Sequence, residues 1–202
     1  MGRIKSSTVG LAIVFISFFF VSLSAEAYEV ETHREISEKV FELNNDETAD
    51  NKVIFTFLKE AGFDGNDYRL NVLQEVFGQG AVNEDMDVFY RPFNHFYDPA
   101  KDRALTIEVP YPFPSGYPVP VVIGDKAHEW ALELNGVEQE RSLQDAYQFY
   151  KQALLAPEGA YLKNSLENTF NTLGYAVHLL EDMAQPQHTR TLRQAQGNRT
   201  II

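Results

Sequence analysis

His178 and Asp182 stand four residues apart in a segment, residues 173–188, whose apolar spacing predicts a helix. Four residues make slightly more than one helical turn, so both side chains project from one face, about 6 Å apart along the axis. An imidazole and a carboxylate in that arrangement can bind one metal ion. Pro186 predicts the end of the helix, and His188 follows in a turn at the same end. The segment therefore predicts a metal site.

A solvent-exposed polar pair that supports the helix would have the same spacing. The flanking positions of this helix are apolar, however, so the face that carries His178 and Asp182 is expected to be buried. An unpaired carboxylate is unfavourable in such a place. Metal binding therefore explains the pair better than surface exposure does.

Three further side chains could supply metal ligands. His33 is expected on the first helix, His95 lies in an Asn-His-Phe-Tyr-Asp segment, and Asp85 follows the third expected helix. Asp87 is a nearby alternative to Asp85. His128 stands outside these motifs and is expected to be structural or at the surface, as lone histidines usually are.

The composition of the chain restricts the type of metal site. The chain has 202 residues, no cysteine and a formal net charge of −12 at pH 7. Metal ligands must therefore be His, Asp, Glu or backbone groups, and this set favours a catalytic metal because structural zinc sites usually use cysteine. The negative charge disfavours sequence-independent binding to duplex nucleic acid, which depends on Lys and Arg.

Residues 1–27 have the pattern of a secretory signal peptide. Two basic residues precede an apolar run over residues 9–23, and residues 25–27 offer a small-x-small cleavage site, Ala-Glu-Ala. An uncleaved membrane anchor is disfavoured because the apolar run is short. We therefore expect one domain over residues 28–202, beginning at Tyr28, in a secreted or periplasmic protein.

Apolar residues at helical spacing predict an all-α domain, and no strand pair is predicted. Thr32 and Glu35 match a capping box, which places the start of the first helix there, with Val40 among its apolar positions. Gly78 or Gly80 is expected to end the third helix, since glycine is favoured just beyond a helix C-terminus. The third helix is expected at 68–77, and the remaining ones at 47–60, 125–134, 138–155 and 158–184.

Two of these helices have clear apolar faces. The positions expected to face the core are Val53, Phe57 and Leu58 in the second helix, and Leu166, Phe170, Leu173, Val177 and Leu180 in the last.

Residues 83–123 lose the helical period and contain seven prolines. A long irregular segment inside a compact domain usually has a function or is disordered. The aromatic stretch at residues 109–114 is expected to form a rigid loop that covers the core. Lining a substrate cleft, or transient contact with a membrane surface, is the alternative.

Four motifs, taken in order, resemble those of the zinc-dependent phospholipase C family and its relatives, the single-strand-specific zinc nucleases. They extend from the expected new N-terminus to His188, almost the whole mature chain. The resemblance implies an all-helical domain with a cluster of three zinc ions. The motifs are an aromatic residue, Tyr28, followed by His33; Gly-Ala-x-x-Glu-Asp at 80–85; Asn-His-Phe-Tyr-Asp at 94–98; and His-x3-Asp-x5-His at 178–188.

The resemblance implies two complete zinc sites that share one bridging carboxylate. Most family members have tryptophan where this chain has Tyr28, and tyrosine keeps the backbone ligands. An α-amino group titrates near pH 8 and gives up its proton readily to zinc. The first zinc would be bound by Asp85, His95, His178 and Asp182, and the second by the amino nitrogen and carbonyl oxygen of Tyr28, by His33 and by Asp182.

The resemblance leaves a third zinc site incomplete. His188 would be its first ligand, and the family supplies a further histidine and an acidic residue downstream. Residues 189–202 contain no His, Asp or Glu and diverge from the family pattern. The chain is therefore expected to be a truncated or altered family member.

The resemblance implies zinc-dependent hydrolysis of a phosphate ester, with phospholipase C-like cleavage of phospholipids favoured. Asp85 would be a zinc ligand and a candidate general base for a metal-activated water. Two alternatives stay open. A single-strand nuclease is disfavoured by the negative charge and by the lack of a basic stripe interleaved with aromatic residues. A zinc-binding remnant without turnover would follow from the incomplete third site.

Overall fold

The computed structural model describes residues 30–43, 53–64, 68–86, 90–109, 119–134, 136–137, 139–186 and 188–189. The predicted signal peptide, Tyr28, Asp87, most of the aromatic loop and the tail beyond Thr189 lie outside this part. The elements in chain order are α2 (Val30–Leu43), α3 (Val53–Glu60), α4 (Leu70–Met86), the 3₁₀ helix η1 (Arg91–Asn94), β1 (Thr106–Val109), β2 (Val119–Val122), α5 (Ala127–Leu132), α6 (Leu143–Leu155) and α7 (Ala160–Met183).

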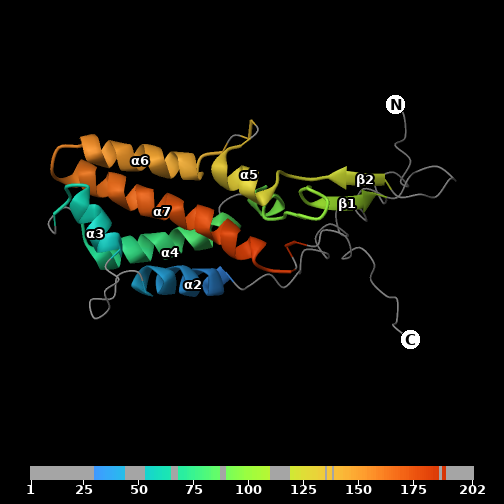
Figure 1. The fold of residues 1–202 in the computed structure, drawn as a ribbon, viewed down its shortest axis with the longest axis horizontal. Helices are drawn as coiled ribbons and strands as arrows, with labels where there is room; N and C mark the ends of the chain where they lie inside the picture. Colours follow the sequence, from blue (N-terminus) through green and yellow to red (C-terminus); the bar gives the residue numbers. More distant parts are fainter. Residues whose placement is uncertain are drawn as a thin grey trace, which may run out of the picture.

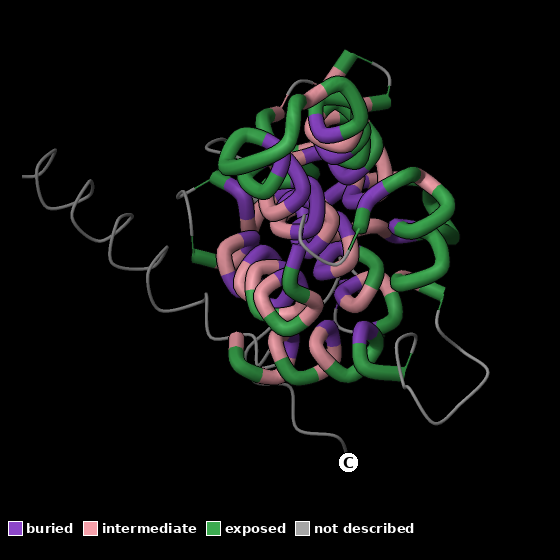
Figure 2. Tube along the Cα trace, turned by 90° about the vertical axis from the view of Figure 1, so that its left-hand side faces the viewer, coloured by how far each residue is buried: buried purple, intermediate pink, exposed green. Residues whose placement is uncertain are grey.

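The described part of the chain is mostly helical, in agreement with the predicted all-α class. Helices α2, α4, α7 and α6 lie side by side along the long axis, and the small sheet extends from one end (Figure 1). Helix α7 is central, because it packs against α4, α6, α5 and α2. Buried residues gather where the helices face one another (Figure 2). No described helix has the length and apolar character needed to cross a bilayer.

The main core lies between α2, α3, α4, α6 and α7. The predicted helix at 158–184 is confirmed as α7, and its apolar face contributes to this core, apart from Leu180, which is 59% exposed. The buried members of this core are Phe41, Leu58, Phe63, Tyr68, Leu73, Phe77, Ala153, Leu162, Leu166 and Phe170.

Helix α4 crosses α7 at very short range. A Cβ atom on Gly80 would lie 1.9 Å from the carbonyl oxygen of Asn171, and one on Gly174 would lie 2.1 Å from that of Phe77. The Asn171 side chain also donates a hydrogen bond to the Val76 carbonyl across the crossing. The prediction that Gly78 or Gly80 ends the helix is therefore wrong: α4 continues to Met86, and Gly80 permits the close approach.

The start and the buried face of α2 also differ from the prediction. The helix begins at Val30, so Thr32 lies inside it and is not the cap. The side chains that face the interior are His33, Ser37 and Phe41, whereas Val40 is exposed. Polar side chains occupy the buried face because they meet other polar groups there, which hydropathy alone does not indicate.

Helix α6 is shorter than predicted, and residues 47–52 of the second predicted helix lie outside the described part of the chain. Helix α3 is described from Val53, and of the three positions expected to face the core only Leu58 is buried, with Val53 and Phe57 exposed. Helix α6 begins at Leu143 because Ser142 and Asp145 form the capping box that fixes its N-terminus.

The proline-rich segment contains more regular structure than predicted. Strands β1 and β2 pair antiparallel, with a register that runs from Thr106 opposite Val122 to Val109 opposite Val119. The expectation of no strand pair is therefore wrong. β-branched residues at several of these positions favour the extended conformation, although the strands are short and their alternation is weak.

Candidate metal centre

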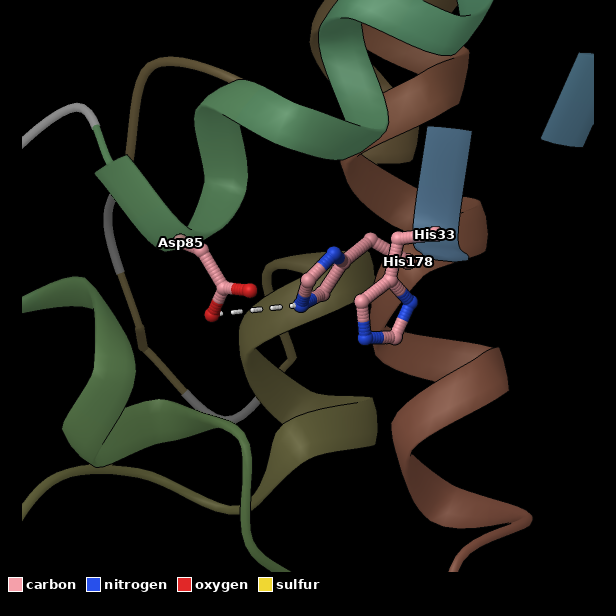
Figure 3. Close-up of side chains that lie close together, drawn as sticks. All are labelled: His33, Asp85 and His178. Atoms are coloured by element: carbon pink, nitrogen blue, oxygen red, sulfur yellow. Dashed lines mark ion pairs between the residues drawn. The ribbon is translucent and has the colours of Figure 1, made fainter. Parts of the chain in front are cut away.

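Five of the predicted ligands meet at one end of the helical bundle. They come from separate elements: α2, the last turn of α4, the residue after η1, and two successive turns of α7. Figure 3 shows three of them, His33, Asp85 and His178, close together, with the Asp85 carboxylate directed toward His178. Of the five, four are 0–2% exposed: His33, His95, His178 and Asp182.

The carboxylate of Asp182 lies at the middle of the cluster. Its Oδ2 atom is 2.8 Å from His95 Nδ1 and 3.3 Å from His178 Nε2. Its Oδ1 atom is 3.4 Å from His33 Nε2. One acceptor therefore faces three buried imidazoles that come from different parts of the chain.

Asp85 stands at the more open side of the cluster. Its Oδ1 atom is 3.6 Å from His178 Nε2, the contact drawn in Figure 3, and 3.5 Å from His95 Nδ1. Its side chain is 20% exposed, whereas the side chains of the imidazoles and of Asp182 are almost fully covered. Among these carboxylates, Asp85 is therefore the one most accessible to solvent or to a bound molecule.

Two overlapping groups of described residues could hold a metal ion. One is His33, Asp85 and His178, and the other is His95, His178 and Asp182, with the ligand atoms of each group within 4.8 Å of one another. His178 belongs to both groups. The grouping differs from the expected one, because His33 joins Asp85 and His178 in addition to facing Asp182.

The donor set fits a metal ion. Imidazole nitrogen and carboxylate oxygen are ligands that zinc accepts. Asp182 Oδ2 is buried and makes no hydrogen bond of good geometry within the described residues, although nitrogen atoms surround it. A buried acceptor in this position is better satisfied by a cation than by misaligned N–H groups. The site therefore has the residues and the burial that a metal requires.

His188 lies beside the same carboxylate. Its Nδ1 atom is 3.3 Å from Asp182 Oδ2 and 3.3 Å from the carbonyl oxygen of His95. Its ring stacks on Phe96, with centroids 4.8 Å apart and planes inclined by 7°. The Tyr97 amide also donates to the His188 carbonyl. The structure therefore brings His188 to the edge of the cluster, packed against the loop that carries His95.

Of the remaining candidates, Tyr28 and Asp87 lie outside the described residues. His128 packs its ring against Tyr97, with centroids 4.4 Å apart. This contact agrees with the structural role that the sequence indicates for His128.

Glu181 is a residue of the site that the sequence reasoning missed. Its Oε2 atom is 2.7 Å from His33 Nδ1, the ring nitrogen that faces away from the cluster. Its Oε1 atom accepts a hydrogen bond of 3.0 Å from the Ser37 hydroxyl. Two features of the sequence could have identified this contact. Glu181 directly precedes a candidate ligand, and Ser37 lies one turn after His33.

Glu84 is a second missed residue and has a similar place. It is fully buried, and its Oε1 atom lies 3.5 Å from His95 Nε2. The same carboxylate accepts hydrogen bonds from the Trp130 indole N–H and from the Arg91 guanidinium. As with Glu181, the residue that follows it is a candidate ligand.

The charges of the cluster are strongly coupled. Burial would raise the pKa of Asp182, but the close imidazoles of His178, His188 and His95 outweigh burial and hold that pKa far below its usual range. Burial would lower the pKa of His95, but the facing carboxylates of Asp182 and Glu84 raise it from 6.5 to about 9. In the metal-free protein His95 therefore carries a positive charge at neutral pH.

These shifts predict how the stability of the metal-free protein depends on pH. The raised pKa of His95 stabilises the fold fully below pH 6.5, and this contribution is lost as the pH rises through about 9. The lowered pKa of Asp182 stabilises the fold above pH 3.8, and this contribution is lost at lower pH. Urea unfolding in the presence of a chelator should therefore show a falling free energy of unfolding between pH 6.5 and 9.

The His95→Gln variant is the control for this slope and should lose most of it. With saturating zinc the slope should reverse, because zinc must displace a proton from His95 and binds more tightly as the pH rises. A metal-free protein that becomes more stable from pH 6.5 to 9 would contradict the assigned charge state.

Comparison with known proteins returned no relatives: no family model matches the chain. No match was found among curated proteins. No solved structure matches it either. The chemistry of the cluster and the motifs of the sequence are therefore the observations that bear on function.

Proposed function

We propose that the protein is a secreted zinc-dependent hydrolase of phosphate esters, of the phospholipase C type. The observation that carries the proposal is the convergence of three imidazoles and two carboxylates on one buried cluster. These side chains come from residues 33 to 182 of the chain and meet within hydrogen-bond distance or slightly beyond. A solvated polar surface would not require such a convergence, whereas a metal centre does.

Each residue of the cluster has a proposed role as a metal ligand or as a general base. Bound zinc would polarise a phosphoryl oxygen and lower the pKa of a water molecule. His95, His178 and Asp182 would hold one ion, with Asp85 beside them, and His33 with the second oxygen of Asp182 would contribute to another, because one imidazole nitrogen binds only one cation. Asp85 has the exposure that a general base needs, because its carboxylate can both reach the cluster and meet an incoming water.

The choice of phospholipid as substrate rests on the sequence motifs and on charge. The net charge of −12 disfavours a nucleic acid as the general substrate, and binding to duplex nucleic acid is not part of the proposal. Secretion follows from the signal-peptide pattern. In the proposed mature protein, Tyr28 stands two residues before the first residue of α2, the helix that carries His33. Its backbone groups are proposed as further ligands.

A comparison of two substrates tests the proposal. The chain, produced with its leader so that it is processed, is supplied with zinc and given phosphatidylcholine vesicles or single-stranded DNA. We expect release of diacylglycerol, and we expect a chelator to lower that rate by at least about 100-fold. Readdition of zinc should restore the rate.

Two other outcomes would replace the proposal with its alternatives. Release of nucleotides without release of diacylglycerol would identify a nuclease. Tight zinc binding without hydrolysis of either substrate would identify a zinc-binding protein that has no turnover.

A further inference from the structure

We propose that Glu84 and Glu181 are positioning residues that determine which ring nitrogen of two histidines is available to a metal. Glu181 makes Nε2 the binding atom of His33, and Glu84 makes Nδ1 the binding atom of His95. The inference rests on the metal binding in the proposed function, but it does not depend on the reaction or on the substrate.

The geometry of His33 fixes its tautomer. Its Nδ1 atom is 2.7 Å from Glu181 Oε2, and its Nε2 atom faces Asp182 Oδ1 at 3.4 Å. An ionised carboxylate only accepts hydrogen bonds, so the nitrogen that faces Glu181 carries the proton. The lone pair of Nε2 is then directed into the cluster, where a metal can take it.

Ser37 holds the Glu181 carboxylate in this orientation. It lies one turn after His33 on the same buried face of α2, and its hydroxyl donates to Glu181 Oε1 at 3.0 Å. The two oxygens of Glu181 are therefore occupied by two donors from one helix. This arrangement restricts the carboxylate more than a single ion pair would.

His95 is turned the other way. Its Nε2 atom faces Glu84 Oε1 at 3.5 Å, and its Nδ1 atom faces Asp182 at 2.8 Å and Asp85 at 3.5 Å. A carboxylate faces each nitrogen, so both carry protons in the metal-free protein; only Nδ1 points into the cluster, where a cation would replace its proton, and Nε2 would keep its proton toward Glu84. The two histidines are thus expected to bind through different nitrogens, each set by its own glutamate.

A buried network keeps Glu84 in place. Arg91 and Trp130 donate to its carboxylate, and the Arg91 guanidinium also lies over the rings of Trp130 and Tyr175, at 5.6 and 5.0 Å from their centroids. Arg91 begins η1, the short helix that leads directly into His95. The contact that neutralises Glu84 therefore also anchors the loop that presents the imidazole.

The two glutamates share a sequence pattern. Each precedes an aspartate of the cluster, in Glu84-Asp85 near the end of α4 and in Glu181-Asp182 near the end of α7. Successive residues of a helix diverge by about 100° around its axis. One carboxylate of each pair can therefore face the metal position while the other reaches a histidine from outside.

The test begins with Glu181→Gln. Glutamine has the shape of glutamate but no charge. Because the Glu181 side chain is 10% exposed, we expect this variant to fold. We expect the affinity for zinc alone, measured by competition with a chromogenic chelator, to fall about 10- to 100-fold. Ser37→Ala should cause a smaller decrease. Glu167→Gln, on the same helix but away from the cluster, is the control and should bind zinc like the wild type.

Nitrogen chemical shifts give a readout that a purely structural role would not change. In long-range ¹H–¹⁵N spectra of the zinc-loaded wild type, we expect His33 to bind through Nε2 and His95 through Nδ1. In Glu181→Gln the His33 signals should show mixed tautomers, while the His95 signals should be unchanged. Glu84→Gln should have the reverse effect if it folds, and if it does not, the Glu181 variants decide the result alone.

The outcomes separate this inference from the proposed function. Unchanged zinc affinity and unchanged His33 signals in Glu181→Gln would overturn the inference, as would wild-type His33 bound through Nδ1. Zinc binding with the expected nitrogens but without hydrolysis would support the inference and reject the proposed activity. A wild type that does not bind zinc would overturn both.

Discussion

Replacement of Asp182 by asparagine is expected to lower zinc affinity by more than about 100-fold and to abolish hydrolysis of phosphate esters. This carboxylate is the acceptor toward which His33, His95 and His178 all converge. An asparagine has no charge, and its amide group would direct N–H donors at one side of the cluster. Competition with a chromogenic chelator measures the affinity, and the vesicle assay measures the rate.

Asp102→Asn provides the control for this prediction. Asp102 is a surface carboxylate bonded to Lys126, and its side chain is 71% exposed. Its replacement should leave zinc affinity and hydrolysis close to the wild-type values. If Asp182→Asn bound zinc as tightly as Asp102→Asn does, the proposed centre would be in the wrong place.

The second large effect is expected from Gly80→Ala. The new Cβ atom would lie 1.9 Å from the backbone oxygen of Asn171, and a helix backbone cannot move away as a side chain can. The two helices must separate, which we expect to lower the free energy of unfolding by about 3 kcal/mol or more. Urea unfolding in the presence of a chelator, which removes any contribution of zinc, measures this change.

Gly78→Ala is the matched comparison, two residues earlier on the same helix. The three atoms nearest to a Cβ atom there, at 2.8–3.2 Å, all belong to the side chain of Glu38, which can move where a backbone cannot. Alanine also has the higher helix propensity, by about 1 kcal/mol. We expect a change of less than about 1 kcal/mol. Equal losses in the two variants would show that the crossing is not the reason for glycine at position 80.

The same pair of glycines shows what the sequence could and could not predict about the fold. The helical period of α7 is long and uninterrupted, and its position was predicted almost to the residue. In α4 the glycines have the local pattern of a helix end, and only contact with α7 explains why the helix continues. Strands β1 and β2 were missed because each has four residues and takes its order from its partner.

The candidate site was also predicted only in part from the sequence. The spacing of His178 and Asp182 predicted that they share a face, and the order of motifs predicted that His33, Asp85 and His95 would join them; the structure places all five in one cluster. The roles of Glu84 and Glu181 could not be predicted. No local pattern states which carboxylate of a Glu-Asp pair turns toward a distant ring, because tertiary packing decides it.

The place of Gly174 in α7 has one more consequence. It lies one turn before His178 and fixes the rotation of α7 against α4 at the point where the two backbones touch. An extra residue inserted between the two would turn everything beyond it by about 100°, so that imidazole and carboxylate would swing out of reach together. The spacing from position 174 to position 182 therefore leaves no room for insertions or deletions.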